Sequence, residues 1–406
     1  MNQYISGNDL NRSDCKVVYT PKKTGKISIS VKSKVDSLYG DAIRELIATT
    51  LKDLDIKSGS VEVIDNGSVP FIIQSRIEAA ISKSATIEQK SLPKLINKFI
   101  ERSSRDRFRR SRLYIPGNQP KLMLNAGIHS ADGIILDLED SVSIDEKISA
   151  RIIVRNALRV LDFFGSEKMV RINQGKLGDS DLEYIVPENV NLILVPKVED
   201  ASDISIIENK ISDIKKSHKV NHDIYLMPII ESAKGVLNAY SIAQASKNIV
   251  ALAIGLEDYT ADLGVERTRD DSETLFARNM LVNAAKAAGV QAIDTVFSDV
   301  ADTDGLKASV KEAKGLGFEG KGCIHPRQIH IINSGFAPTQ LEIDKAKEII
   351  IAFDKAKRDG IGVVSIGSKM IDPPVVKRAE STIKLAISSK LLSKSWKEKR
   401  NEASKK

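Results

Sequence analysis

Eight short, almost wholly apolar runs follow one another from residue 111 onward, and segments with helical periodicity separate most neighbouring runs. Strands buried on both faces of a parallel sheet have this appearance, because neither face meets water. Eight strand–helix units over roughly 250 residues are typical of a closed (β/α)8 TIM barrel. An open, doubly wound sheet is the alternative, but the number of runs favours closure. The runs are RLYIPG (112–117), GIILDLED (133–140), MVRIN (169–173), NLILVPK (191–197), IYLMPIIE (224–231), IVALAIGLED (249–258), VQAIDTV (290–296) and GKGCIHP (320–326).

The first 85 residues have a different pattern, which predicts a small α+β module. Alternation of polar and apolar residues at 26–35 and 59–66 predicts half-buried strands. Residues 40–54 predict a helix between them, with Asp41 in its first turn. The apolar face of this helix consists of Ile43, Leu46, Ile47 and Leu51. We therefore expect four parts: the α+β module at 1–85, a basic, partly helical linker at 86–110, the α/β barrel at 111–385 and a basic tail at 386–406.

The net charge of +7 is concentrated in two segments. Residues 101–112 carry six arginines against two acids, and residues 384–406 carry eight Lys or Arg against two Glu, so the remaining chain is slightly acidic. Nucleic-acid surfaces usually place aromatic side chains among the basic ones, and these segments offer only Phe108 and Trp396. We therefore expect a solvated linker and tail and no nucleic-acid partner. A phosphate-rich small ligand near the arginines is the second alternative.

Composition also limits the compartment and the cofactor. Two cysteines, Cys15 and Cys323, cannot form a disulfide framework or a four-cysteine zinc site, which indicates a reducing compartment. No apolar run approaches the length of a membrane span, and the first residues lack the pattern of a secretory signal. We expect a cytoplasmic protein without a membrane partner. The five histidines show neither HxH nor HExxH spacing, which argues against zinc.

Charged residues end nearly every predicted barrel strand. Active sites of such barrels lie at the C-terminal strand ends, and isolated buried charge is unfavourable, so we interpret these residues as functional rather than as solvated loop residues. Glu231 and Asp258 end consecutive strands, and carboxylates without His or Cys suit Mg²⁺. Arg171 would hold a substrate carboxylate or stabilise a developing oxyanion. The strand ends carry Asp137, Glu139, Asp140, Arg171, Lys197, Glu231, Glu257, Asp258, Asp294 and His325.

A set of motifs between about residues 109 and 385 closely resembles, in the same order, the citrate lyase β subunit family. That family has a barrel fold and includes malyl-CoA and citramalyl-CoA lyases. The motifs are RRSRLYIPGN (109–118), ILDLEDSV (135–142), VRIN (170–173), LVPKVE (194–199), IIES (229–232), AIGLEDYTADLGVERT (253–268), QAIDTVFSD (291–299), GFEGKGCIHPRQI (317–329) and SKMIDPPVVKRA (368–379).

The resemblance implies roles for particular residues. Glu231 and Asp258 match the family's Mg²⁺ ligands, and Arg171 matches an arginine that contacts the substrate and the reacting thioester. Asp372 matches the catalytic acid or base, which lies on a lid that reaches a neighbouring subunit's site, so the resemblance implies a homo-oligomer. Arg110 matches an arginine near the pantetheine phosphate in CoA-using relatives.

The first 85 residues resemble the citrate lyase acyl carrier protein, the γ subunit, through YGDAIR (39–44), VEV (61–63) and RIEAAI (76–81). In that family a serine carries a phosphoribosyl-dephospho-CoA arm within a Glu-Ser-Gly/Ser-Asp context. This chain has Asn11-Arg12-Ser13-Asp14 instead, so the glutamate is absent and Ser13 is the nearest hydroxyl, displaced by one position. We predict attachment at Ser13.

Together the two resemblances imply a γ–β fusion that cleaves a citryl thioester on the carrier arm into oxaloacetate and an acetyl thioester, with Mg²⁺ as cofactor. Asp137 and Glu139 are expected to contact the substrate, and either of them, or a metal-bound water, would take the hydroxyl proton. No segment resembles the α subunit, which transfers the acyl group, so we expect that subunit as a separate partner. A lyase of free CoA thioesters, such as citramalyl-CoA or malyl-CoA, is one alternative. A carrier-like docking scaffold is another.

Overall fold

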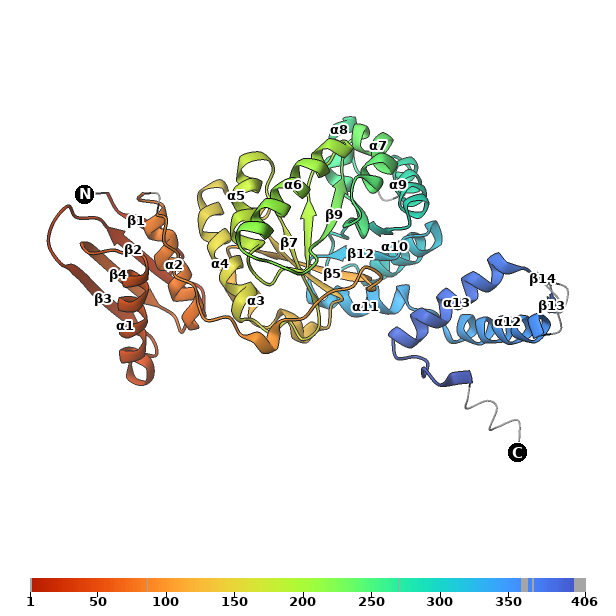
Figure 1. Ribbon diagram of the computed structural model, residues 1–406, viewed down its shortest axis with the longest axis horizontal. Coiled ribbons are helices and arrows are strands. Elements are labelled where there is room, and N and C mark those ends of the chain that lie inside the picture. Colours follow the sequence, from red (N-terminus) through yellow and green to blue (C-terminus); the bar gives the residue numbers. More distant parts are fainter. Residues whose placement is uncertain (1, 86, 269, 359–363, 367–368, 398–406) are drawn as a thin grey trace. The chain divides into compact units, whose positions relative to one another are not determined.

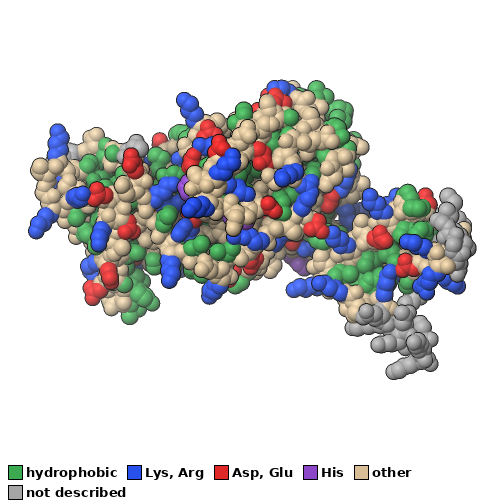
Figure 2. All heavy atoms as spheres, viewed as in Figure 1, with side chains coloured by type: hydrophobic (Ala, Val, Ile, Leu, Met, Phe, Trp, Pro, Cys, Tyr) green, Lys and Arg blue, Asp and Glu red, His purple; other side chains and the backbone are tan. Residues whose placement is uncertain are grey.

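The computed structural model describes residues 2–85, 87–268, 270–358, 364–366 and 369–397, and it divides into two compact units, Met1–Ile329 and His330–Lys406. The first unit holds both the N-terminal module and the barrel (Figure 1). On the face that Figure 2 shows, Lys and Arg side chains are scattered among acidic ones over this unit and do not form one basic stripe. None of the helices in the described ranges is long and apolar enough to cross a membrane.

The N-terminal module is a four-stranded sheet covered by two helices. Its strands are β1 (Tyr4–Ser6), β2 (Cys15–Thr20), β3 (Ile27–Ser33) and β4 (Gly59–Asp65), in the order β1-β2-β4-β3, and only β3 and β4 pair in parallel. Its helices are α1 (Asp36–Asp53) and α2 (Pro70–Ser82). The predicted apolar face of α1 is confirmed, because Ile43, Ile47 and Leu51 are buried and Leu46 packs against the same core. The helix begins earlier than predicted, so the acidic residue in its first turn is Asp36 and not Asp41.

Helix α2 is buried on all sides. Every residue from Phe71 to Ile81 is buried, because one face of the helix covers β1 and β2 and another packs against helix α4 (Lys147–Val160) of the barrel (Figure 1). A surface helix of a free domain would have a polar face toward water. The module is therefore joined to the barrel through a buried helix.

The predicted closed barrel is confirmed. Eight parallel strands close in chain order, and α-helices follow most of them on the outside (Figure 1). The strands are β5 (Ser111–Pro116), β6 (Gly133–Asp137), β7 (Glu167–Arg171), β8 (Leu192–Val195), β9 (Tyr225–Ile230), β10 (Ala251–Ile254), β11 (Gln291–Asp294) and β12 (Gly320–Cys323). Besides α4, the helices are α3 (Pro120–Met123), α5 (Gly175–Ile185), α6 (Ala201–Ser217), α7 (Ala233–Gln244), α8 (Leu256–Leu263), α9 (Leu275–Ala288), α10 (Thr303–Leu316) and α11 (Pro326–Phe336).

The expectation of a solvated arginine linker was wrong for part of its length. Arg109 is fully buried in an ion pair with Glu167, 2.7 Å away, and Arg112 is 1% exposed inside the barrel. The segment before them contains a short 3-10 helix (Asn97–Phe99) and lies against the barrel, where Lys168 Nζ donates to the carbonyl of Phe99. Long-range partners of this kind leave no local sequence pattern.

The second unit has its own small core. Helices α12 (Gln340–Arg358) and α13 (Pro373–Ser388) pack together, and β13 (Val364–Ile366) pairs with β14 (Lys369–Ile371). Part of the predicted solvated tail belongs to this core, because Leu392 and Trp396 pack against it and Lys397 pairs with Asp354 at 2.7 Å. Residues 398–406 of the predicted tail lie outside the described residues.

Candidate active site

A cavity of about 410 Å³ opens at the C-terminal ends of the barrel strands. Most of the predicted strand-end residues lie around it, because all eight parallel strands end on the same side of the barrel. The charged residues lining it are Arg112, Asp137, Asp140, Arg171, Glu231, Glu257, Asp258 and Asp294. The apolar lining includes Ile229, Ala253, Ile254, Leu256, Val296 and Ile324.

Arg171 is the centre of an acidic cluster on one side of the cavity. It is the last residue of β7 and lies in register with Asp137, the last residue of β6. The two side chains form a bidentate pair, with Nε–Oδ1 and Nη2–Oδ2 distances of 2.7 Å. Nη1 lies 2.8 Å from Glu139 Oε2 and 3.0 Å from Asp140 Oδ2. One guanidinium thus orients three carboxylates, and its Cζ lies 5.3 Å from the ring centre of Tyr114.

The carboxylates around Arg171 differ in their proton affinity. Burial alone would raise the pKa of Asp137, but its hydrogen bonds with Arg171 and the charge of that residue hold the pKa below its usual range. Burial raises the pKa of Glu139 to about 7; the charge of Arg171 lowers it in part and the charge of Asp140 adds to it. Gln174, which the sequence analysis did not single out, donates to Glu139 Oε1 at 3.1 Å. Near neutral pH, Glu139 is therefore the carboxylate of this cluster that exchanges a proton most readily.

Glu231 and Asp258 reach the cavity from separate elements. Glu231 directly follows β9 and is 5% exposed, and Asp258 lies in the first turn of α8. Lys197 links them, because its backbone N–H donates to Glu231 Oε1 at 2.7 Å and its Nζ lies 2.8 Å from Asp258 Oδ1. Lys197 has a φ of 51°, a left-handed conformation that is uncommon for a non-glycine residue. Backbone strain of this kind often accompanies functional sites.

The two carboxylates suit a hard divalent cation. Burial raises the pKa of Glu231 to about 8, and the nearby charges of Asp258 and Glu139 add to the effect. The Glu231 carboxylate is therefore unfavourable without a counter-ion, and a cation bound beside it would stabilise the ionised form. A Cβ on Gly255 would approach Glu231 Oε2 to 2.5 Å, so only glycine leaves room for that carboxylate. The described residues contain no cluster of three or more His, Cys, Asp or Glu side chains that would enclose a metal. Mg²⁺ is usually held by one or two carboxylates together with water and substrate, and this pair fits that pattern.

Two predicted site residues of the first unit lie away from the cavity. Arg110 comes just before β5 and bonds Asp132, just before β6, with its Nε 2.8 Å from Oδ2. This position is at the amino ends of the strands, opposite the cavity, so contact between Arg110 and the thioester stays a prediction that the arrangement does not support. Ser13 lies in the turn before β2 with a φ of 58°, and its N–H donates to the carbonyl of Asn66.

Asp372 belongs to the second unit. It caps α13, since its side chain accepts a hydrogen bond from the backbone N–H of Val375 at 3.2 Å. Its expected catalytic role across a subunit boundary stays a prediction.

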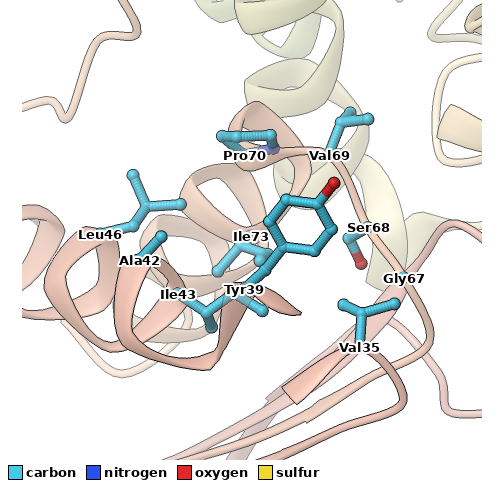
Figure 3. Close-up of a pocket in the computed structure, with 10 residues that line it drawn as sticks. All are labelled: Val35, Tyr39, Ala42, Ile43, Leu46, Gly67, Ser68, Val69, Pro70 and Ile73. Atoms are coloured by element: carbon cyan, nitrogen blue, oxygen red, sulfur yellow. The ribbon is translucent and has the colours of Figure 1, made fainter. Parts of the chain in front are cut away.

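A second cavity, of about 450 Å³, lies in the N-terminal module and is apolar. Figure 3 shows its side chains around the space between α1 and the segment that leads into α2. It is lined by Val35, Tyr39, Ala42, Ile43, Leu46, Gly67, Ser68, Val69, Pro70 and Ile73. None of these lining residues is charged, so this cavity suits an apolar group.

A closed (β/α)8 barrel with carboxylates and an arginine at its C-terminal strand ends defines a class of barrel enzymes, and comparison with known proteins identifies the family. Residues 110–326 match the HpcH/HpaI aldolase/citrate lyase family, and residues 4–84 match the malonate decarboxylase delta subunit family of acyl carrier proteins. The chain therefore belongs to the HpcH/HpaI aldolase/citrate lyase family as a lyase related to citrate lyase β subunits, with an acyl-carrier-like domain at its N-terminus.

Individual relatives support this placement. The citrate lyase subunit beta of Leuconostoc mesenteroides subsp. cremoris is 41% identical over 71% of this chain and 96% of its own length. The mitochondrial citramalyl-CoA lyase of Rattus norvegicus is 35% identical over 70% of this chain and 87% of its own length. Among solved structures, CitE from Mycobacterium tuberculosis in complex with magnesium, acetoacetate and coenzyme A superimposes with a TM-score of 0.57. It is 28% identical and covers 70% of this chain and 99% of its own.

Proposed function

We propose that this protein is a Mg²⁺-dependent lyase that cleaves a citryl thioester, held on its own carrier-like domain, into oxaloacetate and an acetyl thioester. The observation that carries the proposal is the placement of Glu231 and Asp258 in one cavity with the Arg171 cluster, in a chain that also contains an acyl-carrier-like domain. The magnesium complex of the Mycobacterium tuberculosis relative supports the choice of cation.

The reaction is a retro-Claisen cleavage, and we assign each of its steps to particular residues of the site. Glu231 and Asp258 would hold Mg²⁺, which when bound supplies polarisation of the oxygen that becomes the ketone of oxaloacetate. Glu139, with its raised pKa, takes the proton of the substrate hydroxyl as the carbon–carbon bond breaks. Arg171 stabilises the negative charge that develops on the thioester oxygen. Asp372, from a neighbouring subunit, returns a proton to the enolate carbon, which gives the acetyl thioester.

Asp137 has a different role from Glu139. Both of its oxygens are engaged by Arg171, and Oδ2 also accepts from Ser141 Oγ at 2.5 Å. Its lowered pKa makes it a weak base at neutral pH. Asp137 therefore positions Arg171 and helps to bind the substrate indirectly.

The acyl group would travel on a phosphoribosyl-dephospho-CoA arm at Ser13, and a separate citrate lyase α subunit would load it. Tethering raises the effective concentration of the thioester at the barrel, typically to about millimolar levels. Because the lid residue serves a neighbouring site, the working form would be a homo-oligomer.

A lyase of free CoA thioesters is the second candidate function. The identity of 35% to the rat citramalyl-CoA lyase favours it, as does the coenzyme A bound to CitE from Mycobacterium tuberculosis. Comparing kcat/KM for citryl-CoA, citramalyl-CoA and malyl-CoA with turnover of the loaded carrier domain separates the two. Turnover confined to free CoA thioesters would leave the carrier-like domain as a docking scaffold.

The metal assignment is tested by Glu231→Gln and Asp258→Asn, which replace an anionic ligand by a neutral side chain of equal size. We expect weaker Mg²⁺ binding by calorimetry and a loss of lyase activity on the order of 10²-fold. Asp262→Asn is the matched control, because Asp262 lies one turn further along α8 and bonds only the backbone N–H of Ala233 among the described contacts. Near wild-type Mg²⁺ affinity in both site variants would refute the assignment.

A further inference from the structure

Arg112 is a buried arginine whose charge is not matched by a carboxylate among the described residues. It lies in β5 and is 1% exposed. Its Nη1 lies 3.0 Å from the sulfur of Met227, and its Nη2 lies 3.4 Å from the backbone oxygen of Asp294. Within the described part of the chain, its Nε has no hydrogen-bond partner. Across the same ranges, no Asp or Glu oxygen lies within ion-pairing distance of this guanidinium.

The other buried arginines among the described residues of the first unit each pair with a carboxylate. Arg109 pairs with Glu167, Arg155 pairs with Glu78, and each of these pairs is almost completely buried. Removing a charge from water without a partner is strongly unfavourable, and burial accordingly lowers the pKa of Arg112 below its ordinary value. An unpaired guanidinium in this position destabilises the folded chain unless an anion binds and forms an ion pair with it.

Asp294 forms no direct ion pair with Arg112 among the described contacts. Its Oδ2 lies 2.7 Å from Lys321 Nζ and 3.1 Å from Arg278 Nη2. The carboxylate of Asp294 is therefore already paired with two other cations. Arg278 has further partners in Glu312, at 2.6 Å, and Asp271, at 3.5 Å. None of these carboxylates forms an ion pair with Arg112, so its guanidinium has no direct counter-ion among the described residues.

The cavity brings this charge within reach of a ligand. Arg112 lines the same cavity as Glu231 and Asp258, although it is near the start of its strand and they follow the ends of theirs. Barrel interiors are usually filled by layers of bulky side chains. Here Ala253 and Gly322 face the space, and a Cβ on Gly322 would approach Val296 Cγ1 to 2.7 Å. These small residues leave the Arg112 side chain at the wall of the cavity, where a bound ligand would meet it.

We propose that Arg112 is a specificity-determining residue that binds a carboxylate group of the ligand at the floor of the barrel cavity. The ligand class is an oxo or hydroxy acid with two carboxylates, one held near Glu231 and Asp258 and the other by Arg112. A guanidinium binds a carboxylate with two parallel hydrogen bonds, so its Nε and Nη atoms form a ready site for the carboxylate oxygens. This inference rests on the proposed function for its choice of oxo acids as ligands.

The test measures binding and does not require turnover. Calorimetry with Mg²⁺ present compares oxaloacetate with 2-oxobutanoate, in which a methyl group replaces the distal carboxylate. We expect the wild-type chain to prefer oxaloacetate by about tenfold to 100-fold, because a hydrogen-bonded charge pair is worth that factor. In Arg112→Met the preference should disappear while the affinity for 2-oxobutanoate changes little.

Two further variants, Arg112→Lys and Lys168→Met, distinguish a specific role of Arg112 from a general effect of removing a buried charge. Arg112→Met should fold, since replacing a buried unpaired charge by an apolar chain of similar length is neutral or stabilising. Arg112→Lys retains the positive charge but lacks the two parallel N–H donors of the guanidinium, so it should keep part of the preference for oxaloacetate. Lys168→Met is the matched control, because it removes a buried barrel cation that bonds the carbonyl of Phe99 and does not line the cavity. The control should keep the full preference.

The outcomes separate this inference from the proposed function. A preference for oxaloacetate that survives in Arg112→Met overturns the inference and leaves the lyase proposal untouched. A preference lost in that variant, in a protein that cleaves no citryl thioester, supports Arg112 and refutes the lyase proposal. Failure of the wild-type chain to bind either oxo acid overturns the inference as well.

Discussion

Glu78→Gln would break the buried ion pair that joins the carrier-like domain to the barrel. Glu78 lies on α2, and Arg155 on α4 meets it with Nη1–Oε1 and Nη2–Oε2 distances of 2.7 and 2.8 Å. Both side chains are 1% exposed. Glu78 Oε2 also accepts the backbone N–H of Ser91 at 3.1 Å, so the carboxylate joins three segments of the chain.

The expected loss of stability follows from this burial. Glutamine has the size and shape of glutamate, so the change creates no cavity and leaves the Arg155 charge buried without its counter-charge. Breaking a buried pair in this way costs about 3–5 kcal/mol. Replacing both partners by apolar residues, as in Glu78→Leu with Arg155→Met, should cost far less, because neither side chain of the pair then leaves a buried charge without its partner.

Urea denaturation followed by circular dichroism measures the effect on the first unfolding transition. The control is Asp36→Asn on α1, which removes an exposed pair with Arg44 whose side chains are 49% and 46% accessible. That change should cost at most about 1 kcal/mol. A Glu78→Gln chain as stable as the control would refute the view that α2 is anchored through this charge. So would a double variant that is less stable than Glu78→Gln.

Three further predictions concern the arm, the assembly and the pH dependence. Ser13→Ala should lose the prosthetic mass in intact mass spectrometry yet still cleave soluble citryl-CoA, and added mass that persists would place the arm elsewhere. Mixing Asp372→Asn chains with Glu231→Gln chains should restore part of the lyase activity, because mixed oligomers contain sites with both wild-type residues; no recovery after proven subunit exchange would exclude the shared site. Burial and the charge of Arg102 lower the pKa of His222 from 6.5 to about 4, so the folded state binds that proton less tightly than the unfolded chain does. The contribution of His222 to stability is therefore complete above about pH 6.5 and is lost as the pH falls toward 4. Denaturation curves of the wild-type chain should lose stability over that range relative to His222→Asn, and parallel curves would contradict the reasoning.

The barrel could be predicted from the sequence because its cause is local. A strand buried on both faces must be apolar along its length, and eight such runs alternating with helical segments leave few architectures other than a closed barrel. The same reasoning placed Glu231 and Asp258 in one site, since parallel strands end on one side. Two strands of the N-terminal module were missed. β1 has only three residues, and the turn at Ser13 separates it from β2.

The charge arrangement was decided by tertiary structure. A run of arginines looks solvated in sequence, yet Arg109 is buried because Glu167, far along the chain, pairs with it. Glu139 and Asp137 are two residues apart, but their pKa values shift in opposite directions, because Asp137 forms the bidentate hydrogen-bonded pair with Arg171 whereas burial dominates at Glu139. Arg112 lies inside an apolar run, and the sequence of that run does not show whether a carboxylate pairs with Arg112 in the folded barrel. Apolar burial depends on the residue and its near neighbours, whereas the energy of a charge depends on partners that only the folded chain brings within a few ångströms.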